Sequence, residues 1–323
     1  MNFQGLSKIE KYQFYLDVAV KRANKKAAAA RLSKKRLDPL KKSKDIEREK
    51  LDEIKRSLVE SLDMILRSFP SFDQLDEFYQ ELVRITLDYV ALKKSLGSLN
   101  WAAGKIEEIH KIYIKKITGC RVIQDVNRFR QQFMGRISSI LRQVSENLDY
   151  LEECRKIMRE YPTIKTSLFT VAISGFPNVG KSTLLSRITT SRPEINTYAF
   201  TTKSLNLGYD MINHRRVQFI DTPGTLNRVD KMNNIEKQAY LAIKYVVHAI
   251  VFVFDLTESY PLADQHKLLM RMKGFDKPLL IYLSKTDLLH SGKVKDFVRG
   301  SDVRVVTSVA DLRKEISRMK EVI

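Results

Sequence analysis

Residues 175–183 read GFPNVGKST, and their Gly-x-x-x-x-Gly-Lys-Ser pattern is typical of a loop that holds phosphate groups. The glycines allow backbone N–H groups to turn inward around a β-phosphate, and the start of a helix adds positive potential there. In such a loop Lys181 reaches the β- and γ-phosphates, and the Ser182 hydroxyl binds Mg²⁺. The whole loop is expected to contact the nucleotide: Gly175, Phe176, Pro177, Asn178, Val179, Gly180, Lys181, Ser182 and Thr183.

The alternative interpretation of this loop is a glycine turn with a purely structural role. The loop follows the β-rich segment VAIS and precedes the helical segment STLLSRIT, which is the context that the phosphate motif needs. A second motif, DTPG (221–224), ends another β-rich segment. Asp221 is placed there to hold Mg²⁺ through water, and the Gly224 N–H is placed to sense the γ-phosphate. The two motifs together favour a nucleoside triphosphate site.

Two further motifs indicate that the base is guanine. SKTD (284–287) ends a β-rich segment, and Asp287 offers two acceptor oxygens for guanine N1–H and N2–H₂. The Lys285 stem is expected to lie along the base plane. TSVA follows the last β-rich segment, where a backbone N–H of Ser308 or Val309 can donate to guanine O6. Each tetrapeptide is weak evidence alone, but all lie at carboxyl ends of strands, where open α/β sheets bind ligands.

The second half of the chain has the pattern of a covered parallel sheet. From residue 161 onward, short β-rich segments that are apolar on both faces alternate with helical stretches. We therefore predict a Ras-like P-loop GTPase domain of the α/β class, with a mostly parallel, doubly wound sheet, over residues 161–323. The β-rich segments are 167–174, 215–221, 248–255, 278–284 and 303–308.

The first half of the chain is predicted to be helical throughout. Its apolar residues recur at steps of three and four, as on one face of an amphipathic helix. Such helices cannot bury their stripes alone, so residues 1–160 are predicted to form an antiparallel bundle of about four helices. One helix is expected to run from Leu75 to Leu96 and another from Val122 to Leu151. Trp101 is expected to pack in the core, and the alternative, which its exposure decides, is a platform on which a base stacks. The whole fold is thus α plus α/β.

The chain carries a formal net charge of +19, which favours a phosphate-rich partner. Residues 1–50 contain 15 Lys or Arg against 6 Asp or Glu, and the excess is concentrated in residues 20–44. A solvated basic helix is one interpretation, RNA binding is another, and an anionic membrane is disfavoured because no wide apolar face accompanies the charges. We predict that this segment docks on RNA.

Other compositional features restrict the class of protein. Only two cysteines occur, Cys120 and Cys154, and the five histidines are scattered, which argues against a disulfide framework or a zinc site. The longest apolar segment, 246–254, is too short to span a bilayer. We expect a cytoplasmic protein with no membrane partner, and a monomer, since no coiled-coil heptad is present.

The order of GFPNVGKST, FTTK, DTPG and SKTD resembles that of the translation-factor-related GTPases of the Obg-like group. Three longer stretches, 91–106, 129–164 and 221–239, are similar to a narrower family, the nucleolar GTP-binding protein 1 family and its archaeal relatives. The resemblance covers nearly the whole chain. It implies a GTPase that binds GTP or GDP with Mg²⁺ and acts in assembly of the large ribosomal subunit, with ribosomal RNA and assembly factors as partners.

The resemblance also implies roles for the FTTK segment, which corresponds to switch I of these GTPases. By that resemblance Thr202 binds Mg²⁺ when GTP is present, and Phe200 and Thr201 belong to the nucleotide site. Thr202 joins Lys181 and Gly224 as the residues expected to act in hydrolysis.

Two departures from the usual pattern affect these expectations. The base-reading motif usually begins with Asn, and Ser284 replaces it here. Losing one hydrogen bond costs about 0.5–1.5 kcal/mol, so we expect weaker nucleotide binding with the guanine preference kept by Asp287. Many small GTPases place a water-orienting Gln directly after DxxG, where this chain has Thr225. Intrinsic hydrolysis is therefore expected to be slow and stimulated by a ribosomal partner.

An asparagine at the position of Asn178 helps to bind K⁺ in some related GTPases, so K⁺ is a candidate cofactor. The alternative is that Asn178 only shapes the loop. Two other functions also stay open. One is a GTP-bound scaffold that hydrolyses slowly, and the other is an Obg-like regulator of translation or stress on mature ribosomes.

Overall fold

The computed structural model describes residues 3–33, 38–189, 194–195, 206–222, 234–257 and 260–322. The chain divides into two compact units. One comprises residues 3–74 and 83–159, and the other comprises Leu75–Leu82 with the chain from Glu160 onward. Each unit is described by itself below.

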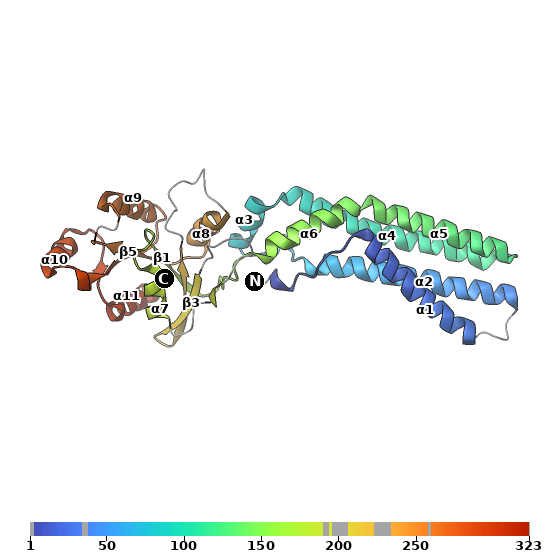
Figure 1. The fold of residues 1–323 in the computed structure, drawn as a ribbon, viewed down its shortest axis with the longest axis horizontal. Coiled ribbons are helices and arrows are strands. Elements are labelled where there is room, and N and C mark those ends of the chain that lie inside the picture. The colour runs from blue at the N-terminus through green and yellow to red at the C-terminus, as the bar shows by residue number, and fades with distance from the viewer. Residues whose placement is uncertain are drawn as a thin grey trace. The chain divides into compact units, whose positions relative to one another are not determined.

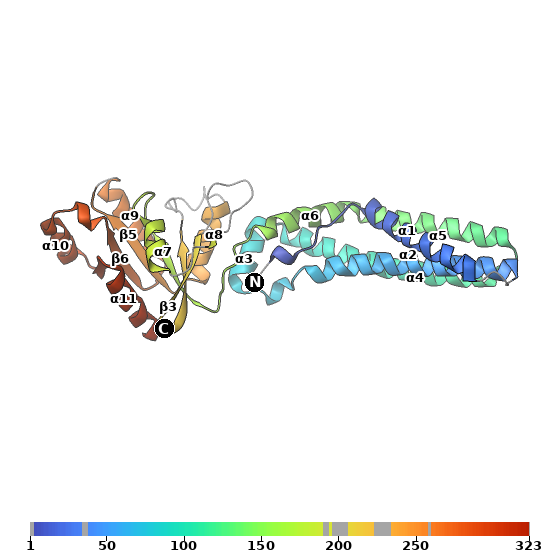
Figure 2. The same cartoon turned by 60° about the horizontal axis from the view of Figure 1, so that its bottom comes forward.

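The first unit is an antiparallel bundle of long helices, as predicted (Figures 1 and 2). Helix α2 packs against both α1 and α4, and α5 packs against α4 and α2. Along the chain, α1, α2, α4 and α5 alternate in direction, and α6 continues in the direction of α5 (Figures 1 and 2). The helices of this unit are α1 (Tyr12–Ser33), α2 (Pro39–Ser68), α4 (Tyr89–Gly119), α5 (Ile123–Gln143) and α6 (Ser145–Arg159), with short 3₁₀ turns at Phe3–Gly5 and Phe72–Gln74. Helix α3 (Glu77–Thr86) is divided between the units, since its residues up to Leu82 belong to the second unit.

The N-terminus of α2 and the packing of α1 follow from local sequence. The Asp38 carboxylate accepts the N–H groups of Leu40 and Lys41 and thereby caps α2, which has Pro39 at its first position. Helix α1 buries a stripe of small side chains, which lets its backbone approach α2 closely. The stripe is Ala19, Ala23, Ala27 and Ala30.

Both long helices expected from the apolar stripes are interrupted. The first is broken at Leu87 and Asp88, because the Asp88 carboxylate accepts the Ala91 N–H and starts a new helix, α4. The second is broken at Val144, between α5 and α6. The apolar stripes continue in phase across both breaks, so periodicity could not reveal them. The expectation for Trp101 was also wrong, since its side chain is 43% exposed on α4.

The second unit contains a seven-stranded sheet of order β2-β3-β4-β1-β5-β6-β7. The pairs β2–β3 and β3–β4 are antiparallel, and all others are parallel, which confirms the predicted mostly parallel sheet. Strands β2 and β3 were not predicted. The strands are β1 (Phe169–Ser174), β2 (Glu194–Ile195), β3 (Asn206–Ile212), β4 (Arg215–Asp221), β5 (Ala249–Asp255), β6 (Leu279–Ser284) and β7 (Val305–Val306).

Helices cover both faces of this sheet. Apolar residues of α7 (Lys181–Ile188) and α11 (Val309–Val322) share one core with alternate strand residues such as Val171 and Val251. On the other face the Phe254 ring contacts His266 of α9 and Phe297 of α10. The remaining helices are α8 (Asn234–Tyr245), α9 (Leu262–Lys273) and α10 (Ser291–Gly300), with a 3₁₀ turn, η4, at Thr286–Leu288.

The segment before β1 is anchored by a buried tyrosine. The Tyr79 hydroxyl lies 2.9 Å from the Pro162 carbonyl oxygen and accepts the Ile164 N–H at 3.0 Å. Thr166 also donates to Asp76. These bonds fix the chain just ahead of the strand that leads into the phosphate motif. In the described ranges of the chain, no helix is long and apolar enough to cross a membrane.

Candidate functional site

The predicted phosphate loop joins β1 to α7 at the carboxyl edge of the sheet. Gly175 has φ +147°, and a Cβ there would lie 2.5 Å from the Val253 carbonyl oxygen, so no other residue fits without a shift. Gly180 has φ +99° and caps α7. Asn178 adopts φ +61° and is exposed at the tip of the loop. The backbone therefore turns as a phosphate-binding loop requires, with the N-terminus of α7 behind it.

The Lys181 side chain lies across the loop. Its Nζ donates to the Phe176 carbonyl oxygen at 2.7 Å, and the residue is 9% exposed. Burial lowers the pKa of Lys181, against the opposing effect of the Asp221 charge. An ammonium has three donors, so two remain for phosphate oxygens. Phosphate charge would offset the cost of burying this ammonium, as the predicted role requires.

Ser182 and Asp221 lie together at the edge between α7 and β4. The Ser182 hydroxyl donates to Asp221 Oδ2 at 2.9 Å, and Asn206 donates to the same oxygen at 3.3 Å. Asp221 Oδ1 is buried and accepts no hydrogen bond from the residues that the structure describes, and burial raises the pKa of this carboxyl group.

An unpaired carboxylate oxygen beside a hydroxyl fits Mg²⁺ that is held mainly by nucleotide phosphates and water. A cage made by the protein alone is not found, since no group of three or more His, Cys, Asp or Glu among the described residues could hold a metal. Ser182 and Asp221 are thus the described residues that fit Mg²⁺.

The predicted base-reading residues follow β6. Ser284 is buried and donates to the Phe254 carbonyl oxygen at 3.1 Å, and its Cβ lies 3.8 Å from the position that a Cβ on Gly180 would take. Lys285 has φ +51°, and Asp287 is exposed in η4. The β6 end and the phosphate loop are therefore adjacent, as a single nucleotide site requires.

Asp255 is a residue that the motif analysis missed. It is fully buried at the end of β5, and its Oδ2 lies 2.6 Å from Lys285 Nζ while its Oδ1 accepts both donors of Thr257. Burial acts to raise the pKa of Asp255, but hydrogen bonds from Lys285 and Thr257 outweigh it and lower the pKa. The sequence contained a signal for this residue, because Asp255 is the last residue of a β-rich segment, as Asp221 is.

The third predicted base contact lies at the start of α11. The Ser308 hydroxyl donates to Asp311 Oδ2 at 2.7 Å and accepts the Asp311 N–H, so Ser308 caps this helix. Val309 is the first residue of α11, where backbone N–H groups lack intrahelical partners. Such an N–H can donate to guanine O6, which stays a prediction.

Several predicted site residues lie outside the described part of the chain. They are Phe200, Thr201, Thr202, Gly224 and Thr225. Their predicted roles in Mg²⁺ binding, γ-phosphate sensing and hydrolysis therefore stay predictions. The described residues that do come together are those of the loop, Asp221 and the β6 end.

Comparison with known proteins identifies the family. Residues 3–165 match the family described as the NOG1 N-terminal helical domain, and residues 170–285 match the family described as 50S ribosome-binding GTPase. An uncharacterized protein of Methanocaldococcus jannaschii is 36% identical over 86% of this chain and 78% of its own length. The chain belongs to the nucleolar GTP-binding protein 1 family. It is therefore a GTP-binding protein with a P-loop GTPase domain, and its fold class is confirmed.

The members of the nucleolar GTP-binding protein 1 family that carry this name are longer. The Drosophila melanogaster protein is 34% identical over 71% of this chain, which spans only 36% of that relative. Among solved structures, the G domain of the T. maritima FeoB iron transporter is 20% identical and covers 47% of this chain and 99% of its own, with a TM-score of 0.38.

Ser284→Asn is expected to tighten GDP binding about 2–10-fold, because an amide can reach the adjacent loop at Gly180 and restore a bond worth about 0.5–1.5 kcal/mol. Titration with a fluorescent GDP analogue measures the change. Ser284→Ala is the matched control, since it removes the hydroxyl without adding an amide and should show no gain. Unchanged or weaker binding by Ser284→Asn would show that the serine is not the cause of weak binding.

Proposed function

We propose that this protein is a GTP-dependent switch that binds precursors of the large ribosomal subunit and releases them after hydrolysis. Family membership supports the proposal, as do the names of the relatives and the description of the family that matches the GTPase domain. The proposed binding to RNA is supported mainly by the exposed surface of α1. That helix buries the alanine stripe described above and exposes cations, among them Lys21, Lys25 and Arg31.

The exposed face of α1 is suited to a polyanion. Phosphate contacts by Lys and Arg supply most of the sequence-independent affinity for nucleic acids. Lys26 and Arg22 are also exposed, but they contact Glu53 and Ser57 of α2. One face of α1 thus packs within the bundle, and the other is available for RNA.

Trp101 is expected to report on RNA binding, because it is the only tryptophan of the chain and 43% of its side chain is exposed. An exposed indole can stack on a base, which is worth about 1–3 kcal/mol. Addition of ribosomal RNA is expected to quench its fluorescence, and Trp101→Ala is expected to weaken binding roughly 5–150-fold. Trp101→Phe, which keeps a stacking ring, should retain most of the affinity. Quenching without any loss of affinity in Trp101→Ala would show that the ring is only nearby.

The nucleotide cycle rests on the residues around the loop. Lys181 binds the terminal phosphates, Asp287 reads guanine, and Asp255 holds the Lys285 stem in place. Ser182, and Asp221 through water, would hold Mg²⁺, and the ion would supply positive charge beside the phosphate oxygens. Thr202 and Gly224 are proposed to sense the γ-phosphate and to change state after hydrolysis.

K⁺ is proposed as a second cation at Asn178, whose exposed side chain stands at the loop tip. Hydrolysis is then expected to be faster in K⁺ than in Na⁺ buffer at equal ionic strength, because a fixed cation stabilises developing phosphate charge. Phosphate release in the two buffers measures the effect, and Asn178→Ala should remove it. Equal rates for the wild type would leave Asn178 with a role only in loop shape.

Depletion of the protein in its source organism tests the proposed function. Accumulation of large-subunit precursors, with small subunits unaffected, is the expected outcome. Normal subunit assembly with altered translation would instead support a regulator of mature ribosomes. A cytoplasmic, monomeric protein is part of the same proposal.

A further inference from the structure

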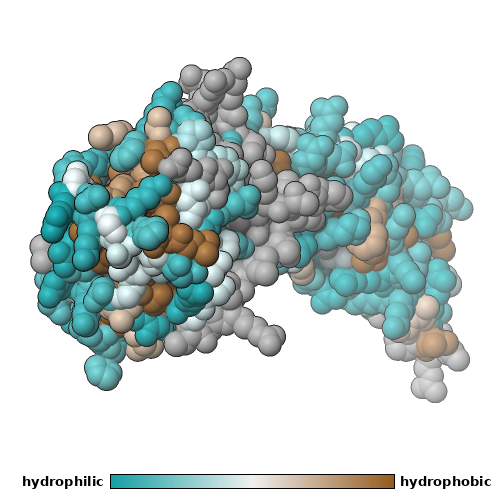
Figure 3. Space-filling view, turned by 60° about the vertical axis from the view of Figure 1, so that its left-hand side comes forward, coloured by the Kyte–Doolittle hydropathy of each residue, from teal (hydrophilic) through white to brown (hydrophobic). Residues whose placement is uncertain are grey.

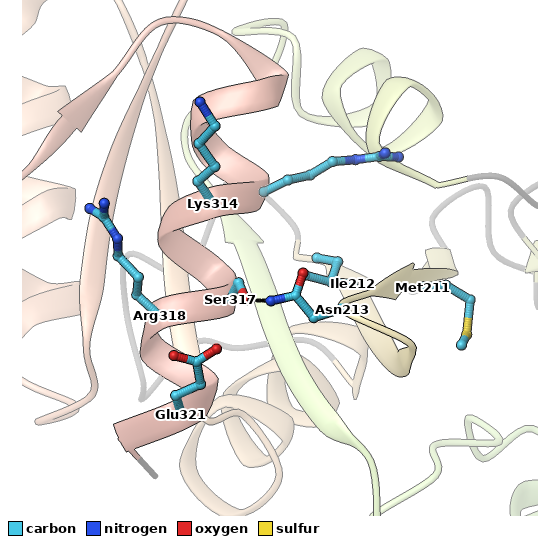
Figure 4. Close-up of a pocket in the computed structure, with 8 residues that line it drawn as sticks. Met211, Ile212, Asn213, Lys314, Ser317, Arg318 and Glu321 are labelled. Atoms are coloured by element: carbon cyan, nitrogen blue, oxygen red, sulfur yellow. Dashed lines mark hydrogen bonds between the residues drawn. The ribbon is translucent and has the colours of Figure 1, made fainter.

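A groove on the GTPase unit lies between α11 and the turn that joins β3 to β4 (Figure 4). It consists of two hollows with volumes of about 440 Å³ and about 220 Å³, and both are lined by Ile212, Asn213, Ser317 and Glu321. We call this the α11 groove. Figure 3 shows one face of this unit in space-filling form, with hydrophilic residues around the edge and apolar patches near the middle.

The walls of the α11 groove are held in place before any ligand binds. Asn213 and His214 have φ +48° and +58°, so they form a tight hairpin turn. The Asn213 amide donates to the Ser317 hydroxyl, which ties the turn to α11. Arg313 donates to the Ile188 carbonyl oxygen and pairs with Asp210 at 2.9 Å. The groove is therefore preformed, which lowers the entropy lost on binding.

The lining of the α11 groove is strongly cationic. Glu321 is its only carboxylate among the lining residues that the structure describes. Some of the cations are already paired, since Arg318 contacts Glu315 at 3.0 Å and Lys314 lies 3.9 Å from Asp311. The cations are Arg215, Arg313, Lys314, Arg318 and Lys320.

The ammonium of Lys320 is shielded from solvent and makes no hydrogen bond to any residue that the structure describes. It lies 5.9 Å from the centre of the Phe169 ring. Burial, and then the charge of Arg215, lowers the pKa of Lys320. A shielded ammonium beside a second cation is stabilised by an anion, and Glu321 is the single carboxylate among the described residues that line the hollow of Arg215 and Lys320.

The spread of the cations favours a chain of phosphates over a single phosphate group. Seven residues separate Arg313 from Lys320, which is about 10 Å along a helix. A nucleic-acid duplex carries one phosphate about every 3.4 Å of axis on each strand. The groove is also open at the surface and has no aromatic side chain among its described lining residues, unlike a typical pocket for a small ligand.

We propose that the α11 groove binds the phosphate backbone of structured RNA, with Arg215 and Lys320 as the principal contacts. This inference extends the proposed function, because it gives the GTPase unit its own RNA contact in addition to the basic face of α1. RNA bound here would lie against β3 and β4, which run to Asp221 at the nucleotide site.

The test uses the full chain saturated with GDP and an RNA duplex of about 16 base pairs, a length that small duplex-binding domains span. The affinity is measured over a range of salt concentrations. The double variant Arg215→Gln/Lys320→Gln is expected to make the negative slope of log affinity against log salt shallower by about 2. Lys295→Gln/Arg299→Gln, two exposed cations of α10, is the matched control and should leave the slope unchanged. Arg215→Lys/Lys320→Arg, which keeps both charges, should behave as the wild type.

Equal slopes for the groove variant and the α10 control would overturn the inference, because binding would then follow total charge. Competition by inorganic phosphate at millimolar concentration, without a change of slope, would also overturn it in favour of a small-anion site. The proposed function is tested separately by co-sedimentation with ribosomal precursors. If the groove variant still sediments with precursors and its salt slope equals that of the wild type, only the RNA contact in the groove is refuted. If the salt slopes differ but the wild type does not sediment with precursors, only the ribosomal role is refuted.

Discussion

Lys181→Met is expected to reduce GTP affinity by roughly 10²–10⁴-fold and to reduce hydrolysis to background. Two hydrogen bonds from an ammonium to phosphate oxygens are worth about 1.5–3 kcal/mol each, and Met removes both while it keeps the apolar stem. The free protein should stay folded, because the ammonium that is lost is a buried charge whose pKa is already lowered by burial. Titration with a fluorescent GTP analogue, together with phosphate release, measures the effect.

Lys267→Met is the control for Lys181→Met, since this lysine is exposed on α9. It should bind and hydrolyse GTP as the wild type does. Thermal unfolding of both variants checks that the fold is retained. A Lys181→Met protein that is folded and still binds GTP within a few-fold of the wild type would contradict the phosphate role of the loop.

Asp287→Asn is expected to change the base that the protein prefers. The carboxylate accepts from guanine N1–H and N2–H₂, and loss of two charged hydrogen bonds lowers GDP affinity by roughly 10²–10⁴-fold. An amide can instead accept from N1–H of xanthine and donate to its C2 carbonyl. Xanthosine diphosphate should therefore bind the variant more tightly than it binds the wild type. Asp287 is exposed, so the substitution should not affect folding.

Competition between the two diphosphates for a fluorescent analogue measures this change of preference. Asp296→Asn, an exposed aspartate of α10, is the control and should keep the preference for guanine. Equal loss of both diphosphates in Asp287→Asn would mean that the residue supports the site without reading the base.

The nucleotide site could be predicted from the sequence because each of its motifs is local. Gly175 and Gly180 are needed by the backbone, and Asp221 and Ser284 end strands that the topology brings to one edge. Asp255 was missed although it occupies the same kind of position. Its role depends on contact with Lys285, thirty residues later, which no single segment contains.

Other features could not be predicted, because they depend on how segments meet. The spacing of apolar residues does not change at the helix breaks at Asp88 and Val144, so this spacing could not predict them. The exposure of Trp101 depends on which face of α4 its neighbours cover. The α11 groove joins a turn at Asn213 to a helix about a hundred residues later, and Lys320 alone resembles any lysine near a helix end.

The proposed switch requires that the bound nucleotide controls binding of the protein to ribosomal particles. Co-sedimentation of the purified protein with particles from its own source tests it most directly, with GDP, with a non-hydrolysable GTP analogue, and with Asp287→Ala as the nucleotide-site control. The expected result is enrichment on large-subunit precursors with the analogue, release with GDP, and no response to nucleotide in the variant. Equal binding to every RNA-containing fraction whatever the nucleotide would contradict it, because the positive charge would then act without a switch.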